Sequence, residues 1–189
     1  MSSPATPGLL FCGAATVLLI FVSVSEPTWH DVYFLRASTR GFQLRFGVFG
    51  YTGTHARLGY RFPITTGELS SSTIHNLTFT LILHPIAAGL SGLAVMFGLC
   101  GSQYHRSGTV LMALSSSLAA LVTLVAFVLD MVLFSIARHE FRKIGWSSQY
   151  GNALWLTVGA LALLLLGFCT STIGIFGSYR RRRYPGYTY

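Results

Sequence analysis

The stretch Ala126–Phe134, AFVLDMVLF, places one carboxylate, Asp130, inside a run that is otherwise wholly apolar. The rest of the chain is apolar too, because 52% of its 189 residues are hydrophobic and only 10% are charged. A soluble domain carries about 25% charged residues. The composition therefore predicts a membrane protein, with Asp130 as a charge inside the membrane.

Four apolar segments are long enough, or nearly long enough, to cross a bilayer. A helix rises about 1.5 Å per residue, so a hydrocarbon core of roughly 30 Å takes about 20 residues. The first segment could instead be a signal peptide cut before Glu26, but it lacks a basic leader and its apolar run is long for that role. We therefore predict an all-α four-helix membrane bundle in a single domain, 1–189. The expected spans are residues 8–24, 77–99, 110–137 and 153–176.

Four spans place both termini on one side of the membrane and the loop 25–76 on the other. Orientation follows Lys and Arg near the membrane, and both sides of this chain carry them. The arginines of the tail 177–189 adjoin the last span directly, whereas those of the loop are spread along a segment that could be translocated as a folded domain. We expect cytoplasmic termini and contact of the tail with anionic inner-leaflet lipids. The tail cluster is Arg180, Arg181, Arg182 and Arg183.

The outer loop has two segments of alternating polarity, FQLRFGVFGY at 42–51 and ARLGYRF at 56–62. Such alternation predicts two half-buried strands, and the TGTH segment between them contains a glycine suited to a turn. We expect a small β-hairpin or sheet, extended by DVYFLR at 31–36. An isolated hairpin is marginally stable in water, so this sheet should pack on the outer mouth of the bundle.

Asp130 has a candidate partner at the same depth. His84 and Asp130 each lie about eight residues from the outer ends of adjacent spans, so both are roughly 12 Å deep. Our hypothesis is that Asp130 accepts a hydrogen bond from His84, directly or through a water. The alternatives are a protonated Asp130 bonded to a hydroxyl such as Thr80 or Thr157, or an Asp130 that faces a partner's helix.

Three blocks and the order of the spans carry a family resemblance. The blocks are FGVFGY (Phe46, Gly47, Val48, Phe49, Gly50 and Tyr51), LILHPIAA at 81–88 and LVTLVAFVLDMVLF at 121–134. In these features the chain resembles the PalI family of fungal ambient-pH response regulators, which is related to the tetraspan proteins of eisosomes and has a claudin-like layout. Two departures stand out: Thr52 occupies a region where many relatives carry a cysteine pair, and the tail is short.

The resemblance implies a multi-pass plasma-membrane protein that assists the assembly, stability or localisation of a multi-span ambient-pH sensor. The alternative is a structural organiser of a plasma-membrane microdomain. A small transporter or channel ranks last, because it would need a polar path and only His84 and Asp130 are evident. The outer histidines His30, His55 and His75 add the hypothesis that the loop itself responds to pH.

The sequence offers no pattern typical of a catalytic or cofactor site. It has no metal-ligand spacing, no nucleotide-binding loop and no nucleophile beside a base. We therefore expect neither enzymatic activity nor a cofactor nor a metal. The expected partners are the lipid bilayer and a multi-span sensor, with a second copy of the chain as a further candidate and no nucleic acid.

Overall fold

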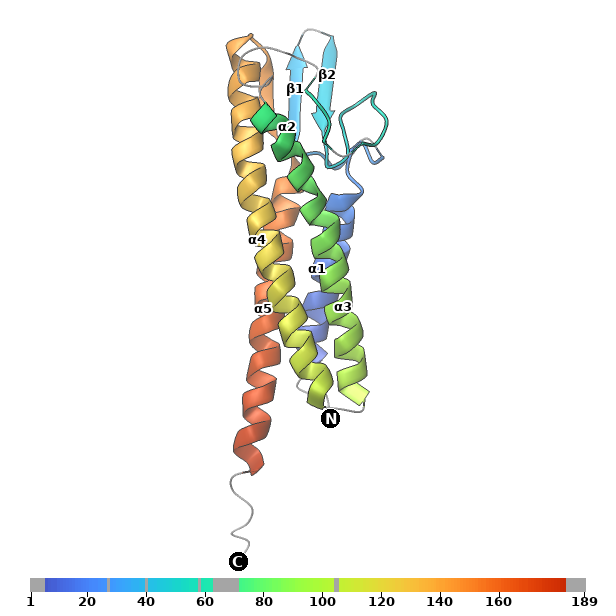
Figure 1. Ribbon diagram of the computed structural model, residues 1–189, viewed down its shortest axis with the longest axis vertical. Helices are drawn as coiled ribbons and strands as arrows, with labels where there is room; N and C mark the ends of the chain where they lie inside the picture. The colour runs from blue at the N-terminus through green and yellow to red at the C-terminus, as the bar shows by residue number, and fades with distance from the viewer. Residues whose placement is uncertain are drawn as a thin grey trace, which may run out of the picture.

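The computed structural model describes residues 6–26, 28–39, 41–57, 59–62, 72–103 and 106–182. Within these residues, long helices run side by side and a small sheet lies at one end of them (Figure 1). The first turn of α1 and the last turn of α5 lie at the opposite end from the sheet. The elements are α1 (Thr6–Ser23), β1 (Leu35–Thr39), β2 (Phe42–Phe46), α2 (Ser72–Phe79), the 3-10 turn η2 (Thr80–Ile82), α3 (Leu83–Gln103), α4 (Arg106–Lys143), β3 (Ser147–Tyr150) and α5 (Asn152–Arg182).

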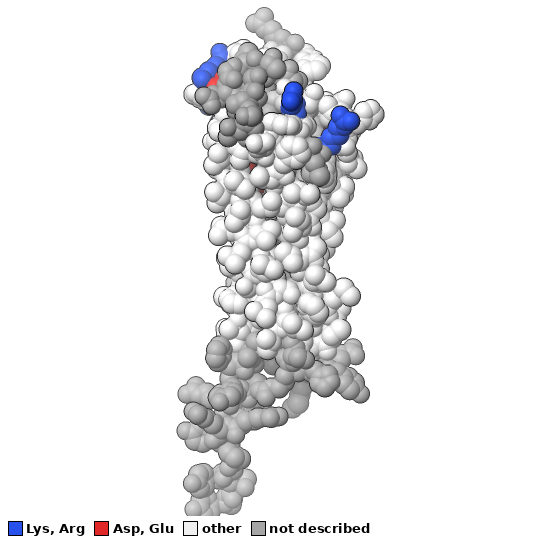
Figure 2. Space-filling view, viewed as in Figure 1, with Lys and Arg blue, Asp and Glu red and all other residues white. Residues whose placement is uncertain are grey.

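Four helical stretches of the described chain are long and apolar enough to cross a membrane. On the face seen in Figure 2 the shaft shows almost no charged side chains, and the Lys and Arg drawn in blue lie at the sheet end. The predicted fold class, a four-helix membrane bundle with a small β region, is confirmed. The four stretches are Thr6–Ser23, Ile74–Gly101, Gly108–Lys143 and Asn152–Ile173.

Helix α4 is longer than a membrane crossing needs. Its 38 residues extend about 57 Å, roughly twice a hydrocarbon core. Its last turns therefore project past the apolar shaft and pack beside the sheet, where Phe141 and Ala137 are fully buried. This projection gives the sheet a hydrophobic surface outside the membrane.

The sheet has three antiparallel strands in the order β2-β1-β3. In the central strand, Leu35 pairs with Phe46 of β2 on one side and with Tyr150 of β3 on the other. Strand β3 comes from the segment between α4 and α5. The sheet thus ties the two outer connections of the chain together.

The predicted hairpin was wrong in its pairing. Strand β2 pairs with β1 across a turn that contains Gly41, whose φ of 86° favours glycine, and the segment 56–62 contains no strand among its described residues. Tyr60 and Phe62 of that segment are buried in the core beneath the sheet. The alternation at 56–62 therefore reflects side chains buried against the sheet. The described backbone of this segment does not pair with a strand.

An aromatic cluster holds the sheet on the bundle. The ring of Phe46 lies 5.1 Å from that of Phe62 and 5.6 Å from that of Phe141 on α4, measured between centroids. Burying one such side chain contributes about 1.5–3 kcal/mol. The strand residue Phe46 thereby couples β2 to the projecting end of α4.

Candidate functional site

The structure brings the two intramembrane polar residues together. Nε2 of His84, on α3, lies 3.1 Å from Oδ2 of Asp130, on α4. Their side chains are 0% and 2% exposed; the two atoms are within ion-pair distance, and neither makes a hydrogen bond of standard geometry among the described residues. A buried polar group that lacks a partner destabilises a fold, so this contact also determines which faces of α3 and α4 meet.

Pro85 explains the orientation of the imidazole. Proline has no N–H, so the carbonyl of Leu81 loses its ordinary donor from four residues on. Nδ1 of His84 lies 3.3 Å from that carbonyl oxygen and donates to it. The 3-10 turn η2 directly precedes this point, where the helical ladder is interrupted. With its proton on Nδ1, a neutral His84 presents a lone pair at Nε2 to Asp130.

One proton between Nε2 and Oδ2 therefore satisfies both residues. Either Asp130 keeps the proton and donates to a neutral imidazole, or His84 holds it and the pair is ionic. The hydroxyls considered as alternatives bond elsewhere: Thr80 donates to the carbonyl of Leu77, and Thr157 donates to that of Ala153. Among the described residues, the polar contact of Asp130 is therefore the one with His84.

The polar pair is connected to the sheet through aromatic rings. Phe34, the residue before β1, meets the ring of His84 edge-on at 5.3 Å and stacks on Phe134 of α4 at 5.1 Å. Tyr60 of the outer loop is buried in the same core, and this burial raises the pKa of its phenol. A displacement of His84 would therefore shift the aromatic side chains that pack beneath the sheet.

The first-loop motif FGVFGY anchors the loop to the end of α1. A side chain at Gly47 would collide with the backbone of Glu26, so only glycine permits this approach. The amide of Val48 donates to Oγ of Ser25 at 3.0 Å, and Tyr60 donates to the carbonyl of Gly47 at 3.1 Å. The motif is therefore a docking turn, with Phe46, Phe49 and Tyr51 packed in the adjoining core.

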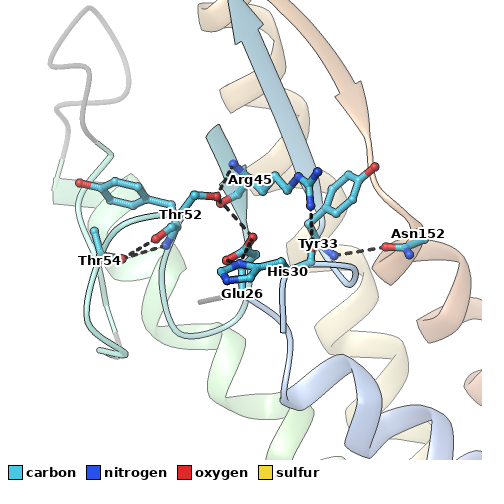
Figure 3. Close-up of polar contacts among 8 residues, drawn as sticks. Glu26, His30, Tyr33, Arg45, Thr52, Thr54 and Asn152 are labelled. Atoms are coloured by element: carbon cyan, nitrogen blue, oxygen red, sulfur yellow. Dashed lines mark hydrogen bonds and ion pairs between the residues drawn. The ribbon is translucent and has the colours of Figure 1, made fainter. Parts of the chain in front are cut away.

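A second polar cluster surrounds Glu26 and was missed by sequence reasoning (Figure 3). The carboxylate of Glu26 is fully buried, and Nδ1 of His30 lies 3.0 and 3.1 Å from its two oxygens. His30 is 69% exposed and covers the carboxylate from the solvent side. Thr52 donates to Glu26 at 3.3 Å, and the guanidinium of Arg45 donates to the carbonyl of His30 at 2.6 Å. The four-residue spacing of Glu26 and His30 was the only available signal.

The remaining predicted residues are the basic tail and the other two histidines of the outer loop. Of the basic tail, Arg180–Arg182 end helix α5, and Arg183 lies outside the described residues. His55 is exposed, and His75 packs its ring edge-on against Phe79 at 5.1 Å. In the described part of the chain, no group of three or more His, Cys, Asp or Glu could hold a metal ion.

Comparison with known proteins gives a family. The model described as the SUR7/PalI family matches residues 4–167, which include α1, the sheet strands β1–β3, and both members of the polar pair. A search of the curated proteins gave no match. The family is generally non-catalytic. Because the match extends over most of the sequence, the chain belongs to the SUR7/PalI family, as its resemblance predicted.

Proposed function

We propose that this chain is a non-catalytic plasma-membrane protein that assists the assembly, stability or localisation of a multi-span ambient-pH sensor. The proposal combines family membership with the chemistry of the bundle. A protein with this role must offer surfaces to another membrane protein and keep its own polar groups internally satisfied.

The observation that carries the proposal is the closed His84–Asp130 pair. A transporter needs polar groups along a path that substrate can reach. Here the two polar groups at mid-depth contact each other, and both are almost completely buried. Their geometry suits a contact that holds α3 and α4 together, and it does not support a role in transport. This leaves the outer sheet and the apolar shaft as the surfaces available to a partner.

The same proposal includes an orientation. The first turn of α1 and the last turn of α5 lie opposite the sheet; Arg180–Arg182 end α5, and Arg183 is the next residue in the sequence. Arginines next to a span favour the cytoplasmic side, and each contributes about 1 kcal/mol near an anionic leaflet. The sheet would then face the cell exterior, where ambient pH acts.

Affinity purification tests the partner directly. The full chain, tagged at its C-terminus, is purified in a mild detergent from cells that also express a tagged seven-span pH sensor and an unrelated multi-span protein of similar abundance. We expect the sensor to be enriched over the unrelated protein. Equal recovery of the two would contradict the proposal, and patchy surface localisation that does not depend on the sensor would favour a microdomain organiser instead.

A further inference from the structure

A groove runs between α4 and α5 directly beneath the sheet. It has a volume of about 280 Å³ and lies on the face of the bundle that a bilayer would surround. Its walls are apolar apart from the phenol of Tyr150, and Trp155 is 75% exposed at its edge. The lining residues are Phe127, Met131, Tyr150, Leu154, Trp155 and Val158.

The upper end of the groove is polar and positively charged. On α4, Phe127 and Met131 are followed on the same face by Ser135, Arg138 and Arg142, at spacings of three or four residues. The hydroxyl of Ser135 lies 3.2 Å from that of Tyr150. The guanidinium of Arg138 stacks over the Tyr150 ring, 4.6 Å from its centroid.

Among the described residues, neither arginine forms an ion pair with a carboxylate. The nearby Glu140 is paired with Lys143. The hydrogen bond with Ser135, followed by the charges of the two arginines, lowers the pKa of Tyr150. The site therefore favours negative charge.

The dimensions of the groove suit one hydrocarbon chain. From Phe127 to Arg138, α4 rises roughly 16 Å, which is about the depth of one leaflet. The groove of about 280 Å³ is lined from Phe127 to Met131 on α4 and from Leu154 to Val158 on α5, roughly 6 Å of rise on each helix, so it takes a segment of one acyl chain. One turn of a helix about 10 Å wide occupies roughly 420 Å³, more than the 280 Å³ of the groove, so a partner's helix does not fit within it.

From this juxtaposition we propose that the α4–α5 groove selects an anionic phospholipid from the leaflet on the sheet side, which is the outer leaflet in the orientation proposed above. An acyl chain would lie between Phe127 and Trp155 and the phosphate at Arg138 and Arg142. An apolar groove capped by two arginines that form no ion pair within the described part of the chain matches both parts of such a lipid. The tyrosine and tryptophan at its rim are placed as such residues commonly are at membrane interfaces.

Trp155 provides its own probe. The chain has three tryptophans, so Trp29→Phe with Trp146→Phe leaves Trp155 as the single fluorophore. The full-length variant is reconstituted into phosphatidylcholine vesicles of two kinds. One kind contains phosphatidylglycerol brominated at mid-chain, and the other contains phosphatidylcholine brominated at the same position. Because one arginine near the surface favours an anionic lipid about fivefold, we expect quenching to show a preference of that order for brominated phosphatidylglycerol.

Variants separate the site from the general bilayer. Arg138→Gln should remove most of the preference, Arg138→Lys should retain it in part, and Val158→Phe should reduce it by filling the groove. Arg36→Gln is the matched control, since Arg36 bonds Gln43 on the sheet, and it should change nothing. Equal quenching by the two lipids, or a preference that survives Arg138→Gln, would overturn the proposal. So would a Trp155 shielded from both lipids in a dimer, because a second copy would then cover the groove.

Discussion

The buried pair makes a quantitative prediction for the stability of the bundle. Replacing His84 with leucine leaves Oδ2 of Asp130 buried without its polar contact, and replacing Asp130 with leucine does the same to Nε2 of His84. The expected loss in the free energy of unfolding is about 1–3 kcal/mol if the pair is neutral, and about 3–5 kcal/mol if it is ionic. The double leucine variant removes both polar groups. Its loss in the free energy of unfolding should therefore be smaller than the sum of the two single losses by about 1 kcal/mol or more.

The state of the shared proton is tested by Asp130→Asn. The amide keeps the shape of the side chain and can donate to Nε2 of His84, but it cannot carry a charge. Stability near that of wild type would identify the neutral pair, and a loss as large as that of Asp130→Leu would identify the ionic one. Thr123→Val on α4 is the control, because Thr123 is buried and donates only to the carbonyl of Ala119 on its own helix.

Thermal unfolding can be followed in detergent with a thiol-reactive dye. Cys12 is completely buried, while Cys100 and Cys169 are exposed, so serine at the two exposed positions leaves a single reporter inside the bundle. The dye then reacts with Cys12 only as α1 separates from its neighbours. If the losses from His84→Leu and Asp130→Leu simply add in the double variant, the two residues are not coupled and the reasoning fails.

Three further predictions concern the tail and the sheet end. Replacing Arg180–Arg183 with glutamine should disturb topology or surface delivery; a C-terminal tag that stays cytosolic with normal delivery would contradict this. Glu26→Ala should lower the melting temperature more than His30→Ala, because the carboxylate is fully buried and the imidazole is 69% exposed; equal losses would refute this. The hydrogen bond with Ser135 is the main cause of the lowered pKa of Tyr150, and burial acts in the opposite direction. Ser135→Ala should therefore raise the pKa of Tyr150 in an ultraviolet titration. The pKa of Tyr150 in the folded state lies below the unfolded value of about 10. Ionised Tyr150 therefore stabilises the fold above about pH 10, and this contribution is lost as the pH falls through the folded pKa. An unchanged pKa in Ser135→Ala would exclude the assigned cause.

The helices and the depth of the polar pair could be predicted from the sequence. Long apolar runs define helices in lipid, and a fixed rise per residue converts position into depth. Two adjacent antiparallel spans then place His84 and Asp130 level with each other. Whether their faces meet also depends on helix rotation, which is set by close contacts such as that of Gly167 on α5 with Cys12 on α1.

The sheet could be predicted only in part. Strand β2 has the expected alternation, but β3 reads SSQY, which is short and polar and joins the sheet because α4 and α5 bring it there. Pairing between strands far apart in sequence leaves no local pattern. The Glu26 cluster was missed for the same reason, since Thr52 reaches Glu26 only after the loop has folded back.

The central claim, assistance to a membrane pH sensor, is tested most directly by the amount of that sensor at the cell surface. A surface-labelled seven-span sensor is quantified in cells that lack this chain and in the same cells carrying the wild type, Thr123→Val or His84→Leu. We predict that surface sensor falls without the chain, recovers with the wild type and with Thr123→Val, and recovers less with His84→Leu. Unchanged surface sensor and an unchanged pH of response in cells that lack the chain would contradict the account.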